Sequence, residues 1–84
     1  MKKRMANKEF IDKAVQIATN YLEAEGIHEP RAEIEKRAVQ WSNQLSFSVE
    51  QRLAAAVIAG DYIPGTTEKE VGEIERFFFL EKNI

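Results

Sequence analysis

The side chains that commonly carry out chemistry are few in this sequence, and their spacing matches no known metal-binding pattern. There is no cysteine, and the single histidine, His28, lies beside Glu29 in the segment "GIHEP". A zinc site needs three or four suitable ligands, so one His–Glu pair is too small a set. We therefore expect no bound metal, and we interpret His28 as a loop residue.

The sequence also lacks the patterns of nucleophilic catalysis and of phosphate binding. A nucleophile needs a neighbouring base that a third group orients, whereas Ser42, Ser46 and Ser48 are better explained by caps and turns. Carboxylate pairs such as Glu33 and Glu35 are two residues apart and face different directions on a helix. The segment "PGTTEKE" has one glycine and lacks the lysine of a P-loop. We expect a non-catalytic protein without a cofactor.

Length and composition predict one globular domain over residues 1–84. The chain has 84 residues, of which 44% are hydrophobic, a typical value for a folded protein. No apolar run approaches the roughly 18 residues of a membrane span. Polar "ANKEF" follows basic "MKKRM", unlike a secretory signal. We expect a cytoplasmic protein without a membrane segment, which the absence of cysteine also fits.

Charge is distributed unevenly along the chain. The net charge is −2, but residues 1–8 carry no acidic side chain. Their basic residues are Lys2, Lys3, Arg4 and Lys8. The other 76 residues hold all 14 acidic side chains and 8 of the 12 basic ones, a net charge of −6. We expect residues 1–7 to be a flexible leader, with Met1 or Met5 as the start, and the acidic remainder disfavours nucleic acid as a partner.

Hydrophobic periodicity predicts helices separated by short joints. The first helix, over residues 8–25, has the clearest apolar face, and Gly26 predicts a Schellman motif at its end. The second begins at Pro30 and carries a narrow apolar stripe, with an expected ion pair between Glu33 and Arg37.

The third and fourth helices complete an all-α, compact single-domain bundle of about four helices. The third, over residues 49–60, is alanine-rich and apolar on every side, so we expect it to be buried at the centre. The fourth begins at a capping box of Thr67 and Glu70 and extends to about Lys82. The β propensity of "FFFL", and the alternation of apolar residues over 45–49, leave a short strand as the alternative at both places.

The run "FFFL", residues 77–80, cannot face the core as a whole. At 100° per residue, Phe77 and Phe78 continue the apolar stripe of the fourth helix, whereas Phe79 and Leu80 point away from it. An exposed phenylalanine forgoes roughly 1.5–3 kcal/mol of burial, and such patches often mark contact surfaces. The predicted patch comprises Gly72, Glu75, Arg76, Phe79 and Leu80. The alternative is that the first helix or the C-terminal tail covers it.

These features predict a protein-binding module that acts stoichiometrically, as a regulator, an inhibitor, an antitoxin-like protein or a homo-oligomeric subunit. We expect Tyr62 and Ile63, from the apolar "DYIPG" joint, to extend the contact patch. The acidic surround favours a partner protein with a basic surface, and a homodimer through the same helix is equally compatible.

A helix-turn-helix-type DNA-binding regulator is the alternative, because a short joint separates the second and third helices. The third helix, however, offers only Gln51 and Arg52 to base edges. Most phosphate contacts would then come from the leader, through Lys2, Lys3, Arg4 and Lys8. Nucleic acid is therefore the less favoured partner.

Overall fold

The computed structural model describes residues 8–80, which form four α-helices and one π-helical turn, with no strand among them. The elements are α1 (Lys8–Ala24), α2 (Arg31–Gln44), α3 (Glu50–Ala59), α4 (Glu68–Glu75) and the π-helix η1 (Arg76–Leu80). The prediction of an all-α bundle is confirmed, and the alternative of a strand at residues 45–49 or 77–80 is wrong. The predicted leader, residues 1–7, and the predicted helix end at Lys82 lie outside the described residues.

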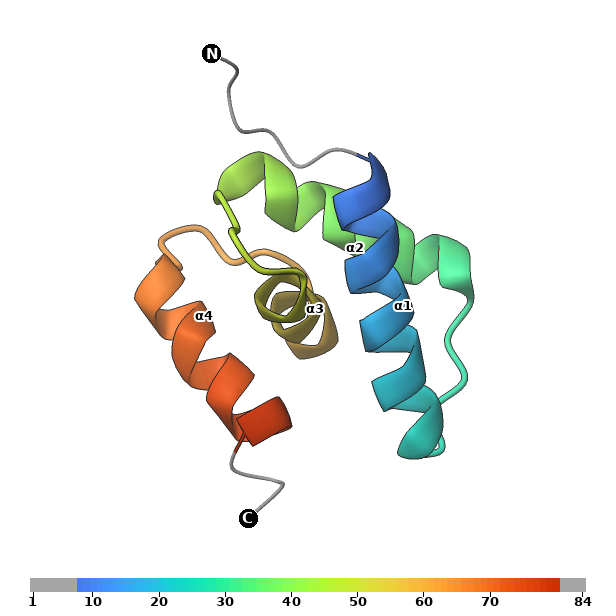
Figure 1. Cartoon of the computed structure of the whole chain (residues 1–84). Helices are drawn as coiled ribbons and strands as arrows, with labels where there is room; N and C mark the ends of the chain where they lie inside the picture. Colours follow the sequence, from blue (N-terminus) through green and yellow to red (C-terminus); the bar gives the residue numbers. More distant parts are fainter. Residues whose placement is uncertain (1–7, 81–84) are drawn as a thin grey trace.

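Helix α3 lies at the centre of the fold. Figure 1 shows it nearly end-on, with α4 on one side and α1 on the other, while α2 crosses the upper part of the bundle. It packs against all three of the other α-helices. Its buried residues are Leu53, Ala54, Ala55, Ala56 and Val57, all fully shielded from solvent. Because alanine ends at Cβ, neighbouring backbones approach closely, and the prediction of a central, buried, alanine-rich helix is confirmed.

The surrounding helices close one hydrophobic core around α3. The buried residues that they contribute are Ala14, Val15, Ala18 and Leu22 from α1, Ile34, Ala38 and Trp41 from α2, and Val71 from α4. These positions recur every three or four residues, as one face of a helix requires.

Local signals in the sequence fix the ends of α1 and α4. Gly26 adopts a φ of +82°, and the amide of Ile27 donates to the carbonyl oxygen of Leu22 at 2.8 Å, which completes the predicted Schellman motif. At the start of α4, the Thr67 hydroxyl accepts from the Glu70 amide, and the Glu70 carboxylate accepts from the Thr67 amide. These two predicted caps are confirmed. The expectation that Ser48 and Gln51 cap the third helix is wrong, because the N-cap of α3 is Val49, without a side-chain hydrogen bond.

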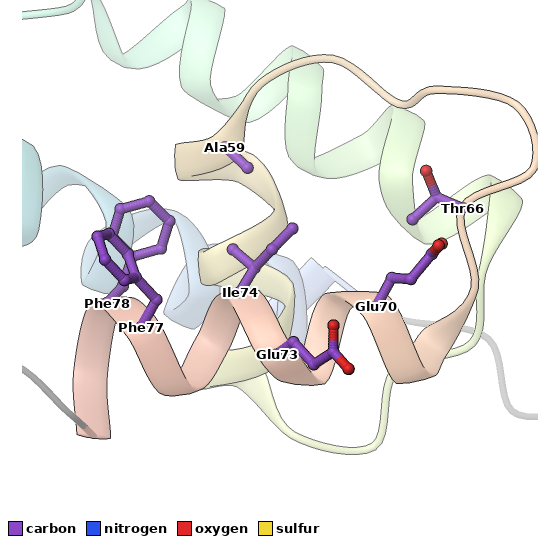
Figure 2. A pocket seen from close by; sticks show the side chains of 7 residues that line it. All are labelled: Ala59, Thr66, Glu70, Glu73, Ile74, Phe77 and Phe78. Carbon is purple, nitrogen blue, oxygen red and sulfur yellow. The ribbon is translucent and has the colours of Figure 1, made fainter.

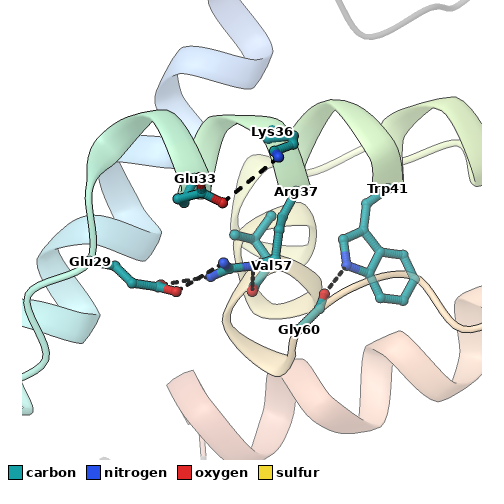
Figure 3. A network of polar contacts seen from close by, with 7 residues as sticks. All are labelled: Glu29, Glu33, Lys36, Arg37, Trp41, Val57 and Gly60. Atoms are coloured by element: carbon teal, nitrogen blue, oxygen red, sulfur yellow. Dashed lines mark hydrogen bonds and ion pairs between the residues drawn. The ribbon is translucent and has the colours of Figure 1, made fainter.

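Two side chains of α2 hold the C-terminal end of α3 (Figure 3). The indole Nε1 of Trp41 donates to the carbonyl oxygen of Gly60 at 2.6 Å, and Nε of Arg37 donates to the carbonyl oxygen of Val57 at 3.1 Å. Both carbonyls belong to the last turn of α3 or follow it, where a helix leaves acceptors unpaired. The two bonds therefore satisfy the helix end and fix its position.

Arg37 also forms an ion pair that differs from the predicted one. Its guanidinium donates to both oxygens of Glu29, at 2.8 and 3.0 Å, while Glu33 lies 4.0 Å from Lys36. These hydrogen bonds lower the pKa of Glu29 and raise that of Arg37. The predicted Glu33–Arg37 pair is wrong because Arg37 reaches Glu29 and α3 together, a geometry that suits its planar fork.

Candidate functional site

The inward face of α4 carries a buried carboxylate. Glu75 is only 9% exposed, and its carboxylate accepts from Nε of Arg52 at 2.9 Å and from the Gln51 amide at 3.4 Å. We predicted Glu75 to lie on the outward face of the helix, which is wrong. It lies on the inward face because Arg52 of α3 pairs with it. This pair fastens α4 to α3, so the surface between the two helices has a defined shape.

Gly72 lies against the same arginine. A Cβ placed on Gly72 would be 3.9 Å from the guanidinium carbon of Arg52. Nη1 of the same arginine lies 3.4 Å from the carboxylate of Glu68. The hydrogen bond with Glu75 raises the pKa of Arg52. Gly72, which was predicted to belong to the contact patch, therefore lies against Arg52 of the same chain.

The π-helical turn changes which phenylalanines face outward. Phe77 is 65% exposed and Leu80 is 50% exposed, whereas Phe79 is partly buried against the core. In η1 the hydrogen bonds skip one more residue than in an α-helix, so each residue advances by less than 100° around the axis. The predicted inward position of Phe77 and outward position of Phe79 are both wrong, while the exposure predicted for Leu80 is confirmed.

Helix α1 covers the inward phenylalanines. The ring of Tyr21 packs edge-to-face on Phe78 at a centroid distance of 5.2 Å and on Phe79 at 5.6 Å. Edge-to-face pairs add about 0.5–1.5 kcal/mol to the area they bury. The alternative that the first helix covers this part of the patch is confirmed for Phe79, which leaves Phe77 and Leu80 as the apolar surface.

An open groove of about 680 Å³ lies between the C-terminal end of α3 and α4. We call it the α3–α4 groove. Its lining residues are Ala59, Thr66, Glu70, Glu73, Ile74, Phe77 and Phe78. Figure 2 shows the two phenylalanine rings at one end, Ile74 beneath Ala59 in the middle, and the carboxylates of Glu70 and Glu73 towards the other end. The groove is thus divided into an apolar end and an acidic end.

The two carboxylates of the groove differ in their partners. One oxygen of Glu70 accepts from the Thr67 amide at 2.9 Å and completes the cap of α4. The carboxylate of Glu73 is exposed and forms no hydrogen bond or ion pair with any residue from 8 to 80. Glu73 is therefore free to bind a cation from another molecule.

Comparisons with known proteins do not assign this fold to a family. No protein-family model matches the chain, and no curated protein or solved structure is significantly similar to it.

The two loop residues of the predicted patch lie apart from the groove lining. The ring of Tyr62 packs edge-to-face on Trp41, with centroids 5.0 Å apart, and so belongs to the edge of the core. Ile63 is exposed, as is Arg76 at the start of η1. Neither loop residue lines the α3–α4 groove.

The described residues of the DNA-binding alternative are paired with acidic side chains of the same chain. Gln51 and Arg52 both bind Glu75, and Lys8 lies 3.3 Å from Asp12. Helix α3, the recognition helix of that alternative, is largely buried. The remaining candidates, Lys2, Lys3 and Arg4, lie outside the described residues.

Residues 8–80 contain neither a candidate metal site nor a helix that could span a membrane. No three His, Cys, Asp or Glu side chains in this range converge to form a potential metal site. Within the same range, no helix combines the length and apolar character needed to cross a bilayer.

Sequence reasoning missed the α3–α4 groove: none of its described lining residues was in the predicted patch, and Ala59, Ile74 and Phe77 were expected to be buried. Ile74 and Phe77 were assigned to the core because an unbroken α-helical wheel aligns them with Val71. No signal in the sequence indicated the groove, because the exposure of Ala59 at the end of α3 is known only from the structure.

Proposed function

We propose that the chain is a small, non-catalytic protein-binding module that acts by stoichiometric contact through the α3–α4 groove. The observation that carries the proposal is the position of Phe77, whose ring is 65% exposed at the apolar end of the groove. An aromatic ring beside a concave apolar surface is the usual composition of an interface hot spot. Leu80, three residues further on in η1, is a second exposed apolar side chain at this end of the chain that the structure describes.

Contacts that hold both helices of the groove support a role in binding. Its α4 side begins at a complete capping box, and the Arg52–Glu75 pair fixes α4 on α3. On the α3 side, Trp41 and Arg37 hold the last turn of the helix. A preformed surface avoids the ordering cost that flexible segments incur when they bind.

The experiment compares the wild type with Phe77→Ser and with the matched control Val39→Ser, which removes an exposed apolar side chain from α2. Each protein is immobilised and incubated with an extract of its source organism, and retained proteins are quantified by mass spectrometry. We expect the wild type and Val39→Ser to retain the same partner protein from the extract, and Phe77→Ser to retain none of it. When purified, the partner should form a one-to-one complex with the wild type.

Equal retention of the same proteins by Phe77→Ser would refute the assigned surface. Sedimentation velocity of the three proteins across a concentration series tests self-association separately. A wild-type dimer that Phe77→Ser abolishes would identify a second copy of the chain as the partner. Circular dichroism of each variant establishes that the helices are intact.

A further inference from the structure

We infer that the α3–α4 groove binds a basic segment of a partner protein, in which an apolar side chain packs on Phe77 and Ile74 while a neighbouring lysine or arginine binds Glu73. This inference rests on the protein-binding function proposed above and specifies the chemical class of the partner. It follows from the division of the groove, the free carboxylate of Glu73 within it, and a described lining that contains no lysine or arginine.

The lining of the groove is complementary to a ligand that carries both an apolar group and a cation. Its apolar end, formed by Ala59, Ile74 and Phe77, gains free energy only when it is covered by apolar atoms. Its other end, formed by Thr66, Glu70 and Glu73, offers a hydroxyl and two carboxylates. A purely apolar occupant would leave the carboxylates near a dry surface without a counter-charge, which is unfavourable.

The carboxylate of Glu73 forms no ion pair with any of the described cations of the protein. Among residues 8–80, no lysine or arginine lines the groove. The nearest cation contributed by α3, Arg52, is already paired with Glu68 and Glu75. The negative charge of Glu73 is therefore available for a partner, and opposite charge at a groove steers association and selects among partners.

The same charges disfavour a second copy of this chain as the occupant. A twofold dimer through the groove brings each subunit's Glu70 and Glu73 to the same interface as those of its partner. No cation from the described part of the chain, residues 8–80, lines the groove to offset them. Like charges placed together at an interface are destabilising, so the occupant is a different, basic segment.

The test is a selection of random dodecapeptides displayed on phage against the full-length protein, with Glu73→Lys, Phe77→Ser and Glu33→Lys selected in parallel. Glu33→Lys makes the same change of charge as Glu73→Lys, but on α2, which packs on α1 and α3. We expect the wild type and Glu33→Lys to enrich peptides that join a large apolar residue to lysine or arginine. Synthetic versions of these peptides should bind Glu73→Lys at least about tenfold more weakly, and Phe77→Ser should not bind them measurably.

Nuclear magnetic resonance then locates the bound peptide. Titration of the best peptide into ¹⁵N-labelled protein should shift the amide signals of Ala59, Glu73, Ile74 and Phe77 more than those of α2. Binding should also weaken as sodium chloride is raised, since exposed ion pairs are screened by salt.

The outcomes separate the inference from the function on which it rests. Enrichment of neutral or acidic apolar peptides, or equal binding of the basic peptides to Glu73→Lys, overturns the inference and leaves a protein-binding groove. If no peptide prefers the wild type to Phe77→Ser, the proposed function of this surface is overturned as well. If the peptide shifts only amide signals on another surface, both the inferred ligand of the groove and its proposed protein-binding function are overturned.

Discussion

Replacing Phe77 and Phe79 separately with alanine gives a direct measure of the register at the end of α4. Phe77 is 65% exposed, so it keeps about a third of the roughly 1.5–3 kcal/mol that full burial of a phenylalanine contributes. Phe77→Ala should therefore lower the free energy of unfolding by about 0.5–1 kcal/mol. Phe79 is partly buried against the core and packs on Tyr21, so Phe79→Ala should cost about 2–3 kcal/mol, below the roughly 3–5 kcal/mol of a fully buried ring.

The assay is urea unfolding of each variant followed by circular dichroism at 222 nm, with thermal unfolding alongside. In a domain of this size, 1 kcal/mol corresponds to a shift of about 4–8 °C in Tm, so the two variants should differ by about 10 °C. The slope of the free energy against urea must be unchanged between them for the comparison to hold. Leu80→Ala serves as the control for shortening an exposed side chain in the same turn.

An uninterrupted α-helix makes the opposite prediction, because it turns Phe77 inward and Phe79 outward. A larger loss of stability for Phe77→Ala than for Phe79→Ala would therefore refute the π-helical register, and with it the surface assigned to Phe77. Equal losses would show that neither ring is preferentially buried, which also contradicts the structure.

Three further substitutions test features elsewhere in the fold. Gly72→Ala should raise the free energy of unfolding by about 0.5–1 kcal/mol, since the added Cβ meets Arg52 only at 3.9 Å and alanine is the better helix former; a fall in Tm would contradict this. Trp41→Phe removes the donor of a 2.6 Å hydrogen bond to the carbonyl that follows α3 and should cost about 1–2 kcal/mol in urea unfolding. The Arg37 hydrogen bonds lower the pKa of Glu29, so this pair stabilises the fold above the ordinary pKa of 4.5 and is lost as pH falls through the lowered value. Glu29→Gln should accordingly weaken the fall in Tm on acidification, and an unchanged pH profile would exclude the pair from acid stability.

The sequence predicted those parts of the fold that depend on local signals. The apolar face of α1, the stop at Gly26 and the capping box of Thr67 and Glu70 each follow from residues a few positions apart. The burial of α3 was equally predictable, because a helix that is apolar on every side has no face suited to water.

The parts that sequence reasoning missed depend on contacts between distant residues or on a register with no local signal. Glu75 is buried because Arg52, on another helix, meets it, and no periodicity along α4 indicates that partner. Glu29 and Glu33 were both candidate partners of Arg37, and the ion pair forms with Glu29, which lies in the loop before α2. Since residues 77–80 are all apolar, their pattern cannot distinguish an α-helical turn from a π-helical one.

The π-helical turn also makes the C-terminal end tolerant of changes in chain length. A π-turn accommodates one residue more than an α-helical turn, so removing one residue before the aromatic run would allow α4 to continue as an ordinary helix. Phe78 and Phe79 would then occupy the two inward positions that the α-helical wheel assigns, and Phe77 would remain outside. Three identical residues in succession thus preserve both the core and the exposed ring when the gene loses a single codon at this point.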